Sequence, residues 1–361
     1  MSDQAQSLRR LADKTRRDAD SPLPAAAGAA NFYESSSSET SLRSSAIEET
    51  KIATDAELNF TPPLAAQYAV TDSRLYPVSR PDPARNRARV LAVTSGKGGV
   101  GKTNFSTSLA LTLAQQGQRV IVLDADLGLA NLHVVLGVTP RYHLEHVLQG
   151  ERTLEETLFR GPCGIQIIGG ASGLSDLANL DGRQRDYFIE SLQTLDTLAD
   201  VIIIDTGAGL SHTVMAFLGA AEEILIVTTP EPTAITDAYA TIKVVTGENP
   251  EAKLRLIVNM AQSVEEAQAV ANRLNRIAQQ FLHISLEFAG SIPLDPAVRA
   301  AVRAQKPFVL LSPNSPASRS IVEIARHLGF SPEKVETAPV KSGGITGLLG
   351  RMQSRFGFLN R

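Results

Sequence analysis

The stretch TSGKGGVGKTN, from Thr94 to Asn104, decides the fold of this chain. From Gly96 it follows the phosphate-loop pattern of a glycine, four residues, a second glycine, a lysine and a threonine. In such a loop, backbone N–H groups surround phosphate oxygens, and the following helix adds its positive N-terminal end. A chance glycine turn is the alternative, but an apolar run precedes the motif and a helical pattern follows it, as phosphate binding requires. We therefore expect this loop to bind a nucleotide.

Within the loop, Lys102 is expected to reach the β- and γ-phosphates, and the Thr103 hydroxyl is expected to bind Mg²⁺. A phosphate loop needs one lysine, so the second one, Lys97, requires another explanation. The predicted nucleotide-binding residues of the loop are Gly96, Lys97, Gly98, Gly99, Val100, Gly101, Lys102, Thr103 and Asn104.

Short apolar runs rich in Ile and Val alternate with helical patterns from Val90 onward. This alternation indicates an α/β fold with a mostly parallel sheet and helices on both faces. A helix is expected from 104 to a stop at Gly117. The expected strands span 89–95, 119–126, 201–209, 223–230, 253–260 and 286–293.

Carboxylates follow two of these expected strands. Asp124 and Asp126 end the second strand, which we expect beside the first, and Asp205 ends the third. Acidic groups near a triphosphate can hold Mg²⁺ or orient an attacking water. Solvated loop acids would be the simpler interpretation of the aspartate pair alone, but a neighbouring phosphate loop favours the functional one. Gly207 and Gly209 would let the loop after Asp205 move when a γ-phosphate arrives.

Composition restricts the classes of function. The chain has 361 residues, a net charge of −3 and a pI of about 6.1, which argues against a nonspecific DNA coat. Cys163 is the only cysteine, so an intrachain disulfide and a multi-cysteine metal or iron–sulfur site within one chain are excluded. With a single cysteine, a reducing cytoplasm is the simplest setting. The N-terminal residues lack the apolar core of a signal peptide, and no apolar run reaches the roughly 20 residues that span a bilayer.

Patterning divides the chain into five parts. The pattern of residues 1–17 predicts a short partner-binding helix. The composition of residues 18–88, which are rich in Ser, Pro and Ala, predicts a disordered linker. Residues 89–330 form the nucleotide-binding domain. A polar tether follows over 331–343, and a basic amphipathic helix over 344–361.

This C-terminal segment carries an apolar stripe at three- and four-residue spacing and no acid. A helix of this kind can lie in the interface of an anionic membrane. Docking on the protein's own core is the alternative, and the tether with Pro339 and Gly343 makes it less compelling. The stripe consists of Ile345, Leu348, Leu349, Met352, Phe356 and Leu359, and the basic residues are Arg351, Arg355 and Arg361.

Three motifs together, KGGVGKT, DADLGLAN and DTGAG, resemble the deviant Walker ATPases of the MinD/ParA class within the P-loop NTPases. Three further stretches are similar to the flagellar-number regulators of that class: DQAQSLR, TTPEPTAITDAYATIK and IPLDPAVRAAVRAQKPF. The resemblance covers about 90–328 and both termini. Relatives often carry an acid where this chain has His133, a difference that leaves the chemistry assignment intact.

The resemblance gives roles to individual residues. It implies that Lys97 reaches across a nucleotide-sandwiched homodimer to the partner's ATP, so that hydrolysis depends on dimerisation. Catalysis would then rest on Lys97, Lys102 and Asp126, which positions the attacking water. Mg²⁺ would be held near Thr103, Asp124 and Asp205.

Asn131 would contact the phosphate region across the dimer by the same resemblance. Asn259, Pro293 and Asp295 would frame the adenine. An amide can pair with a purine edge, but from the residues alone a strand-end cap is an equally good interpretation of Asn259.

At the level of function, the resemblance implies an ATP-dependent dimerising switch that regulates flagellar number or placement. It would be cytoplasmic, with ATP-dependent peripheral association with the cytoplasmic membrane through Ile345–Arg361. Its partners would include a signal-recognition-particle-type flagellar GTPase (FlhF), contacted through Asp3–Arg9, and a flagellar transcription factor or switch-complex protein. A MinD-type division-site regulator, a ParA-type DNA-partitioning ATPase and a non-hydrolysing scaffold are the alternatives, and DNA is disfavoured by the acidic balance. An iron–sulfur carrier is disfavoured by the single cysteine.

Overall fold

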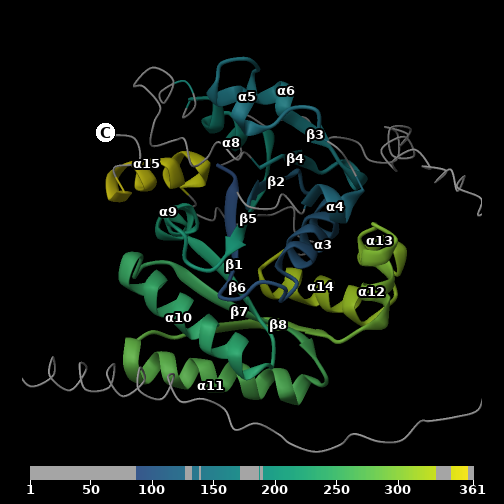
Figure 1. The fold of residues 1–361 in the computed structure, drawn as a ribbon, viewed down its shortest axis with the longest axis vertical. Coiled ribbons are helices and arrows are strands. Elements are labelled where there is room, and N and C mark those ends of the chain that lie inside the picture. The colour runs from purple at the N-terminus through teal and green to yellow at the C-terminus, as the bar shows by residue number, and fades with distance from the viewer. Residues whose placement is uncertain are drawn as a thin grey trace, which may run out of the picture. The chain divides into compact units, whose positions relative to one another are not determined.

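The computed structural model describes residues 87–126, 132–137, 140–170, 187, 190–330 and 343–356. In this part of the chain, eight strands form one sheet in the order β3-β4-β2-β5-β1-β6-β7-β8, and only the β3–β4 pair is antiparallel (Figure 1). The expected mostly parallel α/β sheet is confirmed. The strands that match expectation are β1 (Arg89–Ser95), β2 (Val120–Ala125), β5 (Val201–Ala208), β6 (Glu223–Thr228), β7 (Lys253–Ala261) and β8 (Glu287–Pro293).

Two features of the sheet differ from expectation. The strands β3 (Leu158–Arg160) and β4 (Gln166–Ile168) were not expected, because three residues are too few for a periodic signal. The second predicted strand, β2, does not lie beside β1: it pairs with β5, which in turn pairs with β1. Asp124 therefore lies directly opposite Asp205 in the register.

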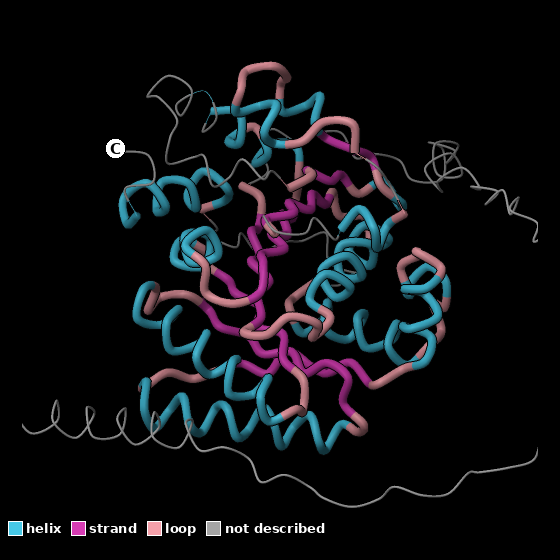
Figure 2. Tube along the Cα trace, viewed as in Figure 1, coloured by secondary structure: helices cyan, strands magenta, loops and turns pink. Residues whose placement is uncertain are grey.

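Helices cover both faces of the sheet (Figure 2). Because side chains alternate along a strand, Leu91 and Val93 of β1 belong to one buried cluster, and Val90 and Ala92 to the other. The first cluster includes residues of α3 (Lys102–Gln115), α4 (Leu132–Leu136), α12 (Pro296–Arg303), α13 (Phe308–Leu311) and α14 (Pro316–His327). The second includes residues of α5 (Leu144–Leu148), α6 (Leu154–Thr157), α8 (Leu195–Leu198), α9 (His212–Ala220), α10 (Pro232–Glu248), α11 (Val264–Leu282) and α15 (Gly344–Phe356).

The last helix, α15, packs on the body of the protein, which is the docked arrangement that the sequence made the less compelling alternative. Four stripe residues, Ile345, Leu348, Leu349 and Met352, are at most 6% exposed and belong to the buried cluster that contains α9. The side chain of Phe356 and all of Leu359 lie outside the described residues. The surface of the same chain that α15 packs on supplies polar anchors as well as apolar contacts, and these stabilise the docked helix.

Those anchors come from distant parts of the chain. Asp196 accepts hydrogen bonds from the backbone N–H groups of Ile345 and Thr346, at 2.7 and 3.1 Å, and so caps the start of α15. Arg351 pairs with Glu222 at 2.9 Å and donates to the carbonyl of Ala220, at the end of α9. The helix is thus attached at its start and in its middle. We call the surface that holds it, with Asp196, Ala220 and Glu222, the seat of α15.

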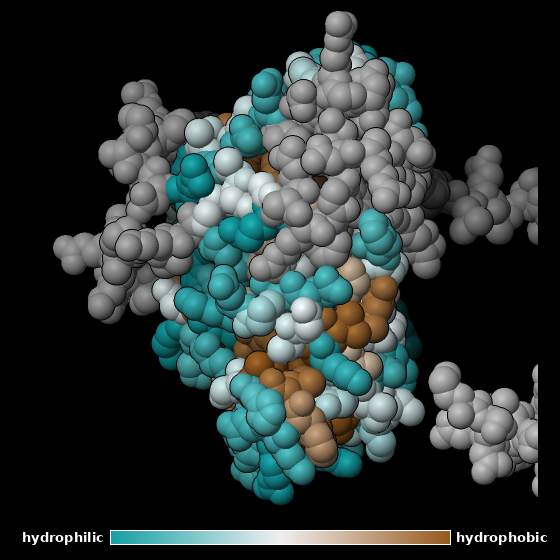
Figure 3. Space-filling view, turned by 90° about the vertical axis from the view of Figure 1, so that its left-hand side faces the viewer, coloured by the Kyte–Doolittle hydropathy of each residue, from teal (hydrophilic) through white to brown (hydrophobic). Residues whose placement is uncertain are grey.

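The surface seen in Figure 3 is largely hydrophilic, and its apolar areas gather in the middle and lower part of the view. Among the described residues, no helix is long and apolar enough to cross a membrane. The predicted helix over 1–17, nearly all of the predicted linker over 18–88 and residues 331–342 of the tether lie outside the described residues.

Candidate functional site

The glycine loop lies between the end of β1 and the start of α3, as the motif requires. Gly101 precedes the first helical residue with φ 88°, a left-handed conformation that side chains disfavour. A Cβ on Gly96 would lie 2.2 Å from the carbonyl oxygen of Asp237, so only glycine fits against α10 there. The sequence requirement for glycine therefore has two causes: backbone direction at one end of the loop and close packing at the other.

The lysine at the start of α3 lies in a buried polar network. Lys102 Nζ lies 3.2 Å from Asp205 Oδ1, with side chains 7% and 1% exposed, and Ser106 Oγ donates to the same oxygen at 3.0 Å. Burial raises the pKa of Asp205, and the Lys102 charge opposes that shift. A phosphate chain arriving at the loop would offer Lys102 a second anionic partner.

The carboxylate of Asp124 faces the same region from the neighbouring strand. It accepts hydrogen bonds from the N–H groups of Asp126 and Leu132, at 3.1 and 3.4 Å. Burial raises its pKa to about 7, against those hydrogen bonds, and the charge of Asp205 adds to the increase. Two buried carboxylates side by side are destabilised as anions, and a cation between them and a phosphate would relieve that cost.

Oxygen donors of this kind suit Mg²⁺. Thr103, Asp124 and Asp205 offer a hydroxyl and two carboxylates, which are ligands that this cation prefers. Within the described segments, no three His, Cys, Asp or Glu side chains converge on one point as a metal site. The residues therefore fit a cation that binds together with phosphate oxygens rather than one held by protein alone.

The second lysine points away from this network. Lys97 Nζ contacts Glu231 Oε2 at 2.8 Å and Thr233 Oγ1 at 3.1 Å, at the start of α10. Its side chain is 39% exposed, in contrast to the 7% of Lys102. The two lysines of one loop thus have separate environments, one inside the subunit and one at its surface.

The loop after β5 connects this site to α9. Thr206 Oγ1 donates to the Val93 carbonyl, and Gly209 N–H donates to the Ser95 carbonyl at 3.0 Å, so the loop is attached to the strand that carries the phosphate loop. A Cβ on Gly207 would lie 3.4 Å from Asp126 Oδ1 and 3.6 Å from Val214 of α9. Asp126 lines the cleft at this point, whereas Asn131 lies outside the described residues.

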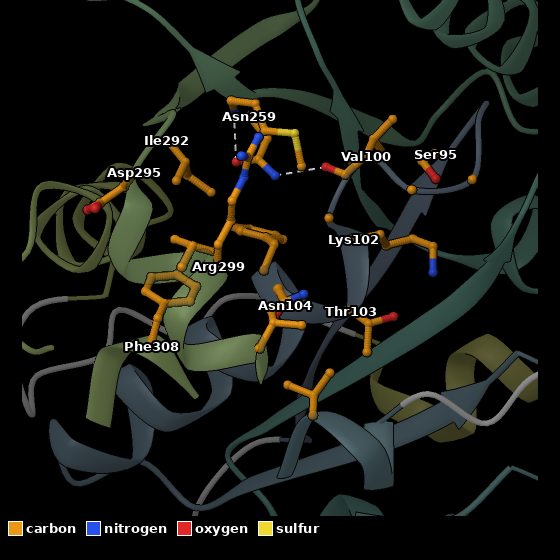
Figure 4. A pocket seen from close by; sticks show the side chains of 18 of the residues that line it. Ser95, Val100, Lys102, Thr103, Asn104, Asn259, Ile292, Asp295, Arg299 and Phe308 are labelled. Atoms are coloured by element: carbon orange, nitrogen blue, oxygen red, sulfur yellow. Dashed lines mark hydrogen bonds between the residues drawn. The ribbon is translucent and has the colours of Figure 1, made fainter. Parts of the chain in front are cut away.

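At the far end of β7, Asn259 holds the phosphate loop. Its Nδ2 donates to the Val100 carbonyl at 2.8 Å, and its Oδ1 accepts from Met260 N–H at 2.9 Å (Figure 4). A Cβ on Gly101 would come within 2.3 Å of that same Nδ2. Both polar atoms of the amide already have partners within the chain.

Asp295 is similarly engaged. It begins α12 and accepts from the N–H groups of Ala297 and Ala317, at 2.8 and 3.0 Å. Burial raises the pKa of this carboxyl, but hydrogen bonds, those from the two N–H groups among them, lower it by more, so the net shift of the pKa is downward. Asp295 therefore joins α12 to α14.

One cleft has a volume of about 790 Å³. Of the predicted site residues, its lining includes the loop from Gly98 to Asn104 with Asp126, Asn259, Pro293 and Asp295, whereas Gly96, Lys97, Asp124 and Asp205 are not among its lining residues. The sequence did not single out several further lining residues, which include Met260, Val298, Arg299, Val302, Arg303 and Phe308.

Two protein-family models match the chain. A model described as AAA domain covers residues 88–255, and a model described as NUBPL iron-transfer P-loop NTPase covers residues 188–329. The chain has one cysteine, Cys163, so it has no cysteine pair with which to bind iron.

Two similar proteins cover most of their own length in the alignment with this chain. The antiactivator FleN of Pseudomonas aeruginosa is 41% identical over 244 residues, which is 68% of this chain and 87% of the relative. The flagellum site-determining protein YlxH of Helicobacter pylori is 39% identical over 259 residues, 71% of this chain and 86% of the relative.

Solved structures of the septum site-determining protein MinD share the fold. MinD of Pyrococcus horikoshii, complexed with Mg-ADP, has a TM-score of 0.56 and 28% identity, covering 71% of this chain and all of that one. MinD in the MinC:MinD complex of Aquifex aeolicus has a TM-score of 0.55 and 27% identity, with 68% and 97% covered.

Proposed function

Because the chain belongs to the MinD/ParA family of P-loop ATPases, we propose that it is an Mg²⁺-dependent ATPase that acts as a dimerising switch controlling flagellar number or placement. The observation that carries this proposal is the contrast between the two lysines of the loop. Lys102 is buried against Asp205, whereas Lys97 is exposed at the rim of the same loop. A loop with one lysine turned outward suits an active site that is completed by a second subunit.

The chemistry follows from the positions of the acids. Lys102 and the loop amides would hold the β- and γ-phosphates, and Mg²⁺ would enter with them near Thr103, Asp124 and Asp205. Asp126, on the cleft wall beside Gly207, would orient the attacking water. Bound Mg²⁺ would supply positive charge to the phosphates as negative charge moves toward the leaving oxygen.

Dimerisation would complete this site. Lys97 would leave Glu231 and Thr233 and bind the phosphates of the partner subunit, where its charge stabilises the transition state. The contact it leaves is an exposed ion pair, of the kind worth about 0–1 kcal/mol, so its loss is readily offset by a phosphate contact. Asn131 would approach the phosphates from the same side.

The name of YlxH, a flagellum site-determining protein, supports a flagellar role, and the alignment with this chain spans 86% of that relative. We propose FlhF, a signal-recognition-particle-type GTPase, as a partner bound through Asp3–Arg9, and a flagellar transcription factor or switch-complex protein as a second. The alternative is a MinD-type regulator of the division site, supported by the fold shared with MinD. Stimulation of FlhF GTP hydrolysis by a peptide of residues 1–17 would separate the two.

Membrane association requires α15 to leave its seat, because its apolar stripe is buried in the described state. We propose that the ATP-bound dimer favours the released helix, which then binds anionic lipid through Ile345–Arg361, and that the monomer retains it in the cytoplasm. The route from the nucleotide is short, since Gly207 at the end of β5 lies beside Asp126, and the loop after β5 continues into α9, which packs in the same buried cluster as α15. Two helices per dimer would bind lipid far more strongly than one.

The decisive experiment measures particle size by light scattering with Mg-ADP and with a nonhydrolysable ATP analogue. The proposal predicts a monomer with ADP and a dimer with the analogue. Asp126→Ala should accumulate the dimer with ATP itself, and Lys97→Ala should bind ATP but lose hydrolysis. Equal sizes in both nucleotides, or a Lys97→Ala variant that hydrolyses ATP like the parent, would contradict the switch.

A further inference from the structure

The end of the cleft opposite the phosphate loop has few polar side chains available to a ligand. Asn259 uses Nδ2 on the Val100 carbonyl and Oδ1 on the Met260 N–H. Asp295 uses one oxygen on Ala297 N–H and the other on Ala317 N–H. Both residues that a sequence pattern would assign to the base therefore already hold neighbouring parts of the fold in place.

Arg299 differs from them. It projects from α12 into the same cleft, and its side chain is exposed. Among the described residues, it makes no hydrogen bond and no ion pair, unlike Arg255 and Arg351, which have acidic partners. Figure 4 shows the Arg299 side chain running from α12 toward Asn259. An arginine that points into a cleft without an acidic partner is available to a ligand.

The surroundings of Arg299 are apolar. Met260, 38% exposed and in the left-handed conformation with φ 57°, lies beside Asn259, and Leu294 and Val298 line the cleft nearby. A strained backbone at an exposed apolar residue is typical of a binding site. Because phosphates must lie at the glycine loop, the base of a nucleotide extends to this end of the cleft.

We propose that Arg299 is a base-contacting residue, whose guanidinium stacks on the purine ring against the wall formed by Met260 and Val298. This inference rests on the proposed nucleotide binding. A planar guanidinium attracts the face of an aromatic ring and needs no hydrogen-bond partner on its edge. Asn259 then acts as a positioning residue, which keeps the phosphate loop in place beside the base.

Calorimetry with the full chain can test this contact, using ADP and inorganic tripolyphosphate, which has phosphates and no base. Arg299→Ala should weaken ADP binding by about 2- to 30-fold, which is the range of a cation–π contact, and leave tripolyphosphate binding unchanged. Arg299→Lys keeps the charge and loses the planar group, so it should stay nearer the alanine variant than the parent. Arg303→Ala, one turn farther along α12 and also exposed in the cleft, is the control for charge.

Three outcomes would overturn the assignment: unchanged ADP binding by Arg299→Ala, an equal loss for ADP and tripolyphosphate, or an equal loss for Arg303→Ala. The second would make Arg299 a phosphate-attracting charge. Since Arg299 is exposed, its removal should leave the melting temperature unchanged, so that a binding loss reports the contact. A parent chain that binds ADP, with no loss of affinity in Arg299→Ala, contradicts this inference alone, whereas a parent chain that does not bind ADP contradicts the proposed nucleotide site.

Discussion

The phosphate loop and the seat of α15 are both anchored by buried or partly buried acids, but they are built for opposite tasks. At the loop, Lys102 and two carboxylates are enclosed, and the pKa of Asp124 and that of Asp205 are raised by burial. At the seat, four apolar side chains are covered while the Arg351–Glu222 pair remains about one-third exposed. The loop thus holds unfavourable charge that a ligand relieves. The surface under α15, in contrast, is already satisfied by contacts within the chain, and in the proposed switch lipid would have to compete with those contacts.

The largest expected effect tests whether the phosphate-loop region holds unfavourable charge. The pKa of Asp124 is about 7 in the folded chain and 3.8 in the unfolded reference. Between these values the folded state holds a proton that the unfolded state has lost, so the unfolding free energy without nucleotide and Mg²⁺ should fall as pH rises. The total loss should be on the order of 4 kcal/mol by pH 8. Urea unfolding from pH 4 to 8 measures it.

Asp124→Asn is the matched variant, since it keeps the shape and cannot ionise. It should remove the part of the slope that belongs to Asp124, and the part from Asp205 remains in the same direction. An unfolding free energy of the parent that stays level or rises from pH 4.5 to 7 would contradict the view that the site holds unfavourable charge.

The second expected effect compares one leucine in each region. Leu109 of α3 and Leu348 of α15 are both fully buried. Leu109→Ala should cost about 2–5 kcal/mol, the usual loss for a core leucine. Leu348→Ala should cost less, because the chain can release α15 once its docking becomes weak, and the loss then stops at the undocking free energy. Denaturant unfolding of both variants gives the comparison.

Deletion of 344–361 sharpens this result. If α15 is a separable element, Leu348→Ala and the deletion should lose nearly the same global stability, and amide exchange in α15 should be faster than in α3. Equal losses for the two leucine variants would instead make α15 an integral part of the core.

The same contrast explains what the sequence could predict. The loop and its strands were predictable because each signal lies within a few residues: the glycine spacing, the apolar run of β1 and the acids that end β2 and β5. The position of β5 between β2 and β1 was missed, since strand order depends on contacts between segments that are 81 residues apart for the β2–β5 pair and 112 residues apart for the β1–β5 pair. The short strands β3 and β4 carry no periodic pattern at all.

The seat of α15 shows the limit most clearly. Its stripe and basic residues were visible, and they fit a membrane helix as well as a docked one. The docked state is stabilised by Asp196 and Glu222, which lie more than 100 residues before α15 in the chain. No sequence pattern near either residue indicates that it contacts this helix. In the cleft, Arg299 was missed for a related reason: a helical arginine has no signature until its lack of an acidic partner is known.

The third expected effect is on ligand binding at the loop. Lys102→Ala should weaken ATP binding by about 10- to 150-fold, the range of a hydrogen bond to a charged group. Lys97→Ala is the matched control, since it removes the same charge from the same loop at an exposed position. Calorimetry should find its ATP affinity much closer to that of the parent. Similar losses for both variants would mean that the loop does not divide its lysines between two subunits.

The smallest expected effect tests whether the seat controls membrane binding. Asp196 accepts from Ile345 N–H, Thr346 N–H and the Thr346 hydroxyl, so Asp196→Ala removes the cap of α15 and an anchor together. Loss of such a cap costs about 0.5–2 kcal/mol, and all of it favours the released helix. Co-sedimentation with phosphatidylcholine–phosphatidylglycerol vesicles in ADP should therefore rise by about 2- to 30-fold.

Ser263→Ala is the control, because Ser263 caps α11 through Glu266 N–H and does not contact α15. It should lower the unfolding free energy by a similar amount without changing the vesicle-bound fraction. If both variants sediment with vesicles alike, general destabilisation is the cause and the seat has no special role. If only Asp196→Ala does so, and deletion of 344–361 abolishes its binding, then release of α15 limits membrane association. In that case the seat alone, without any change of nucleotide, is sufficient to keep the helix from lipid.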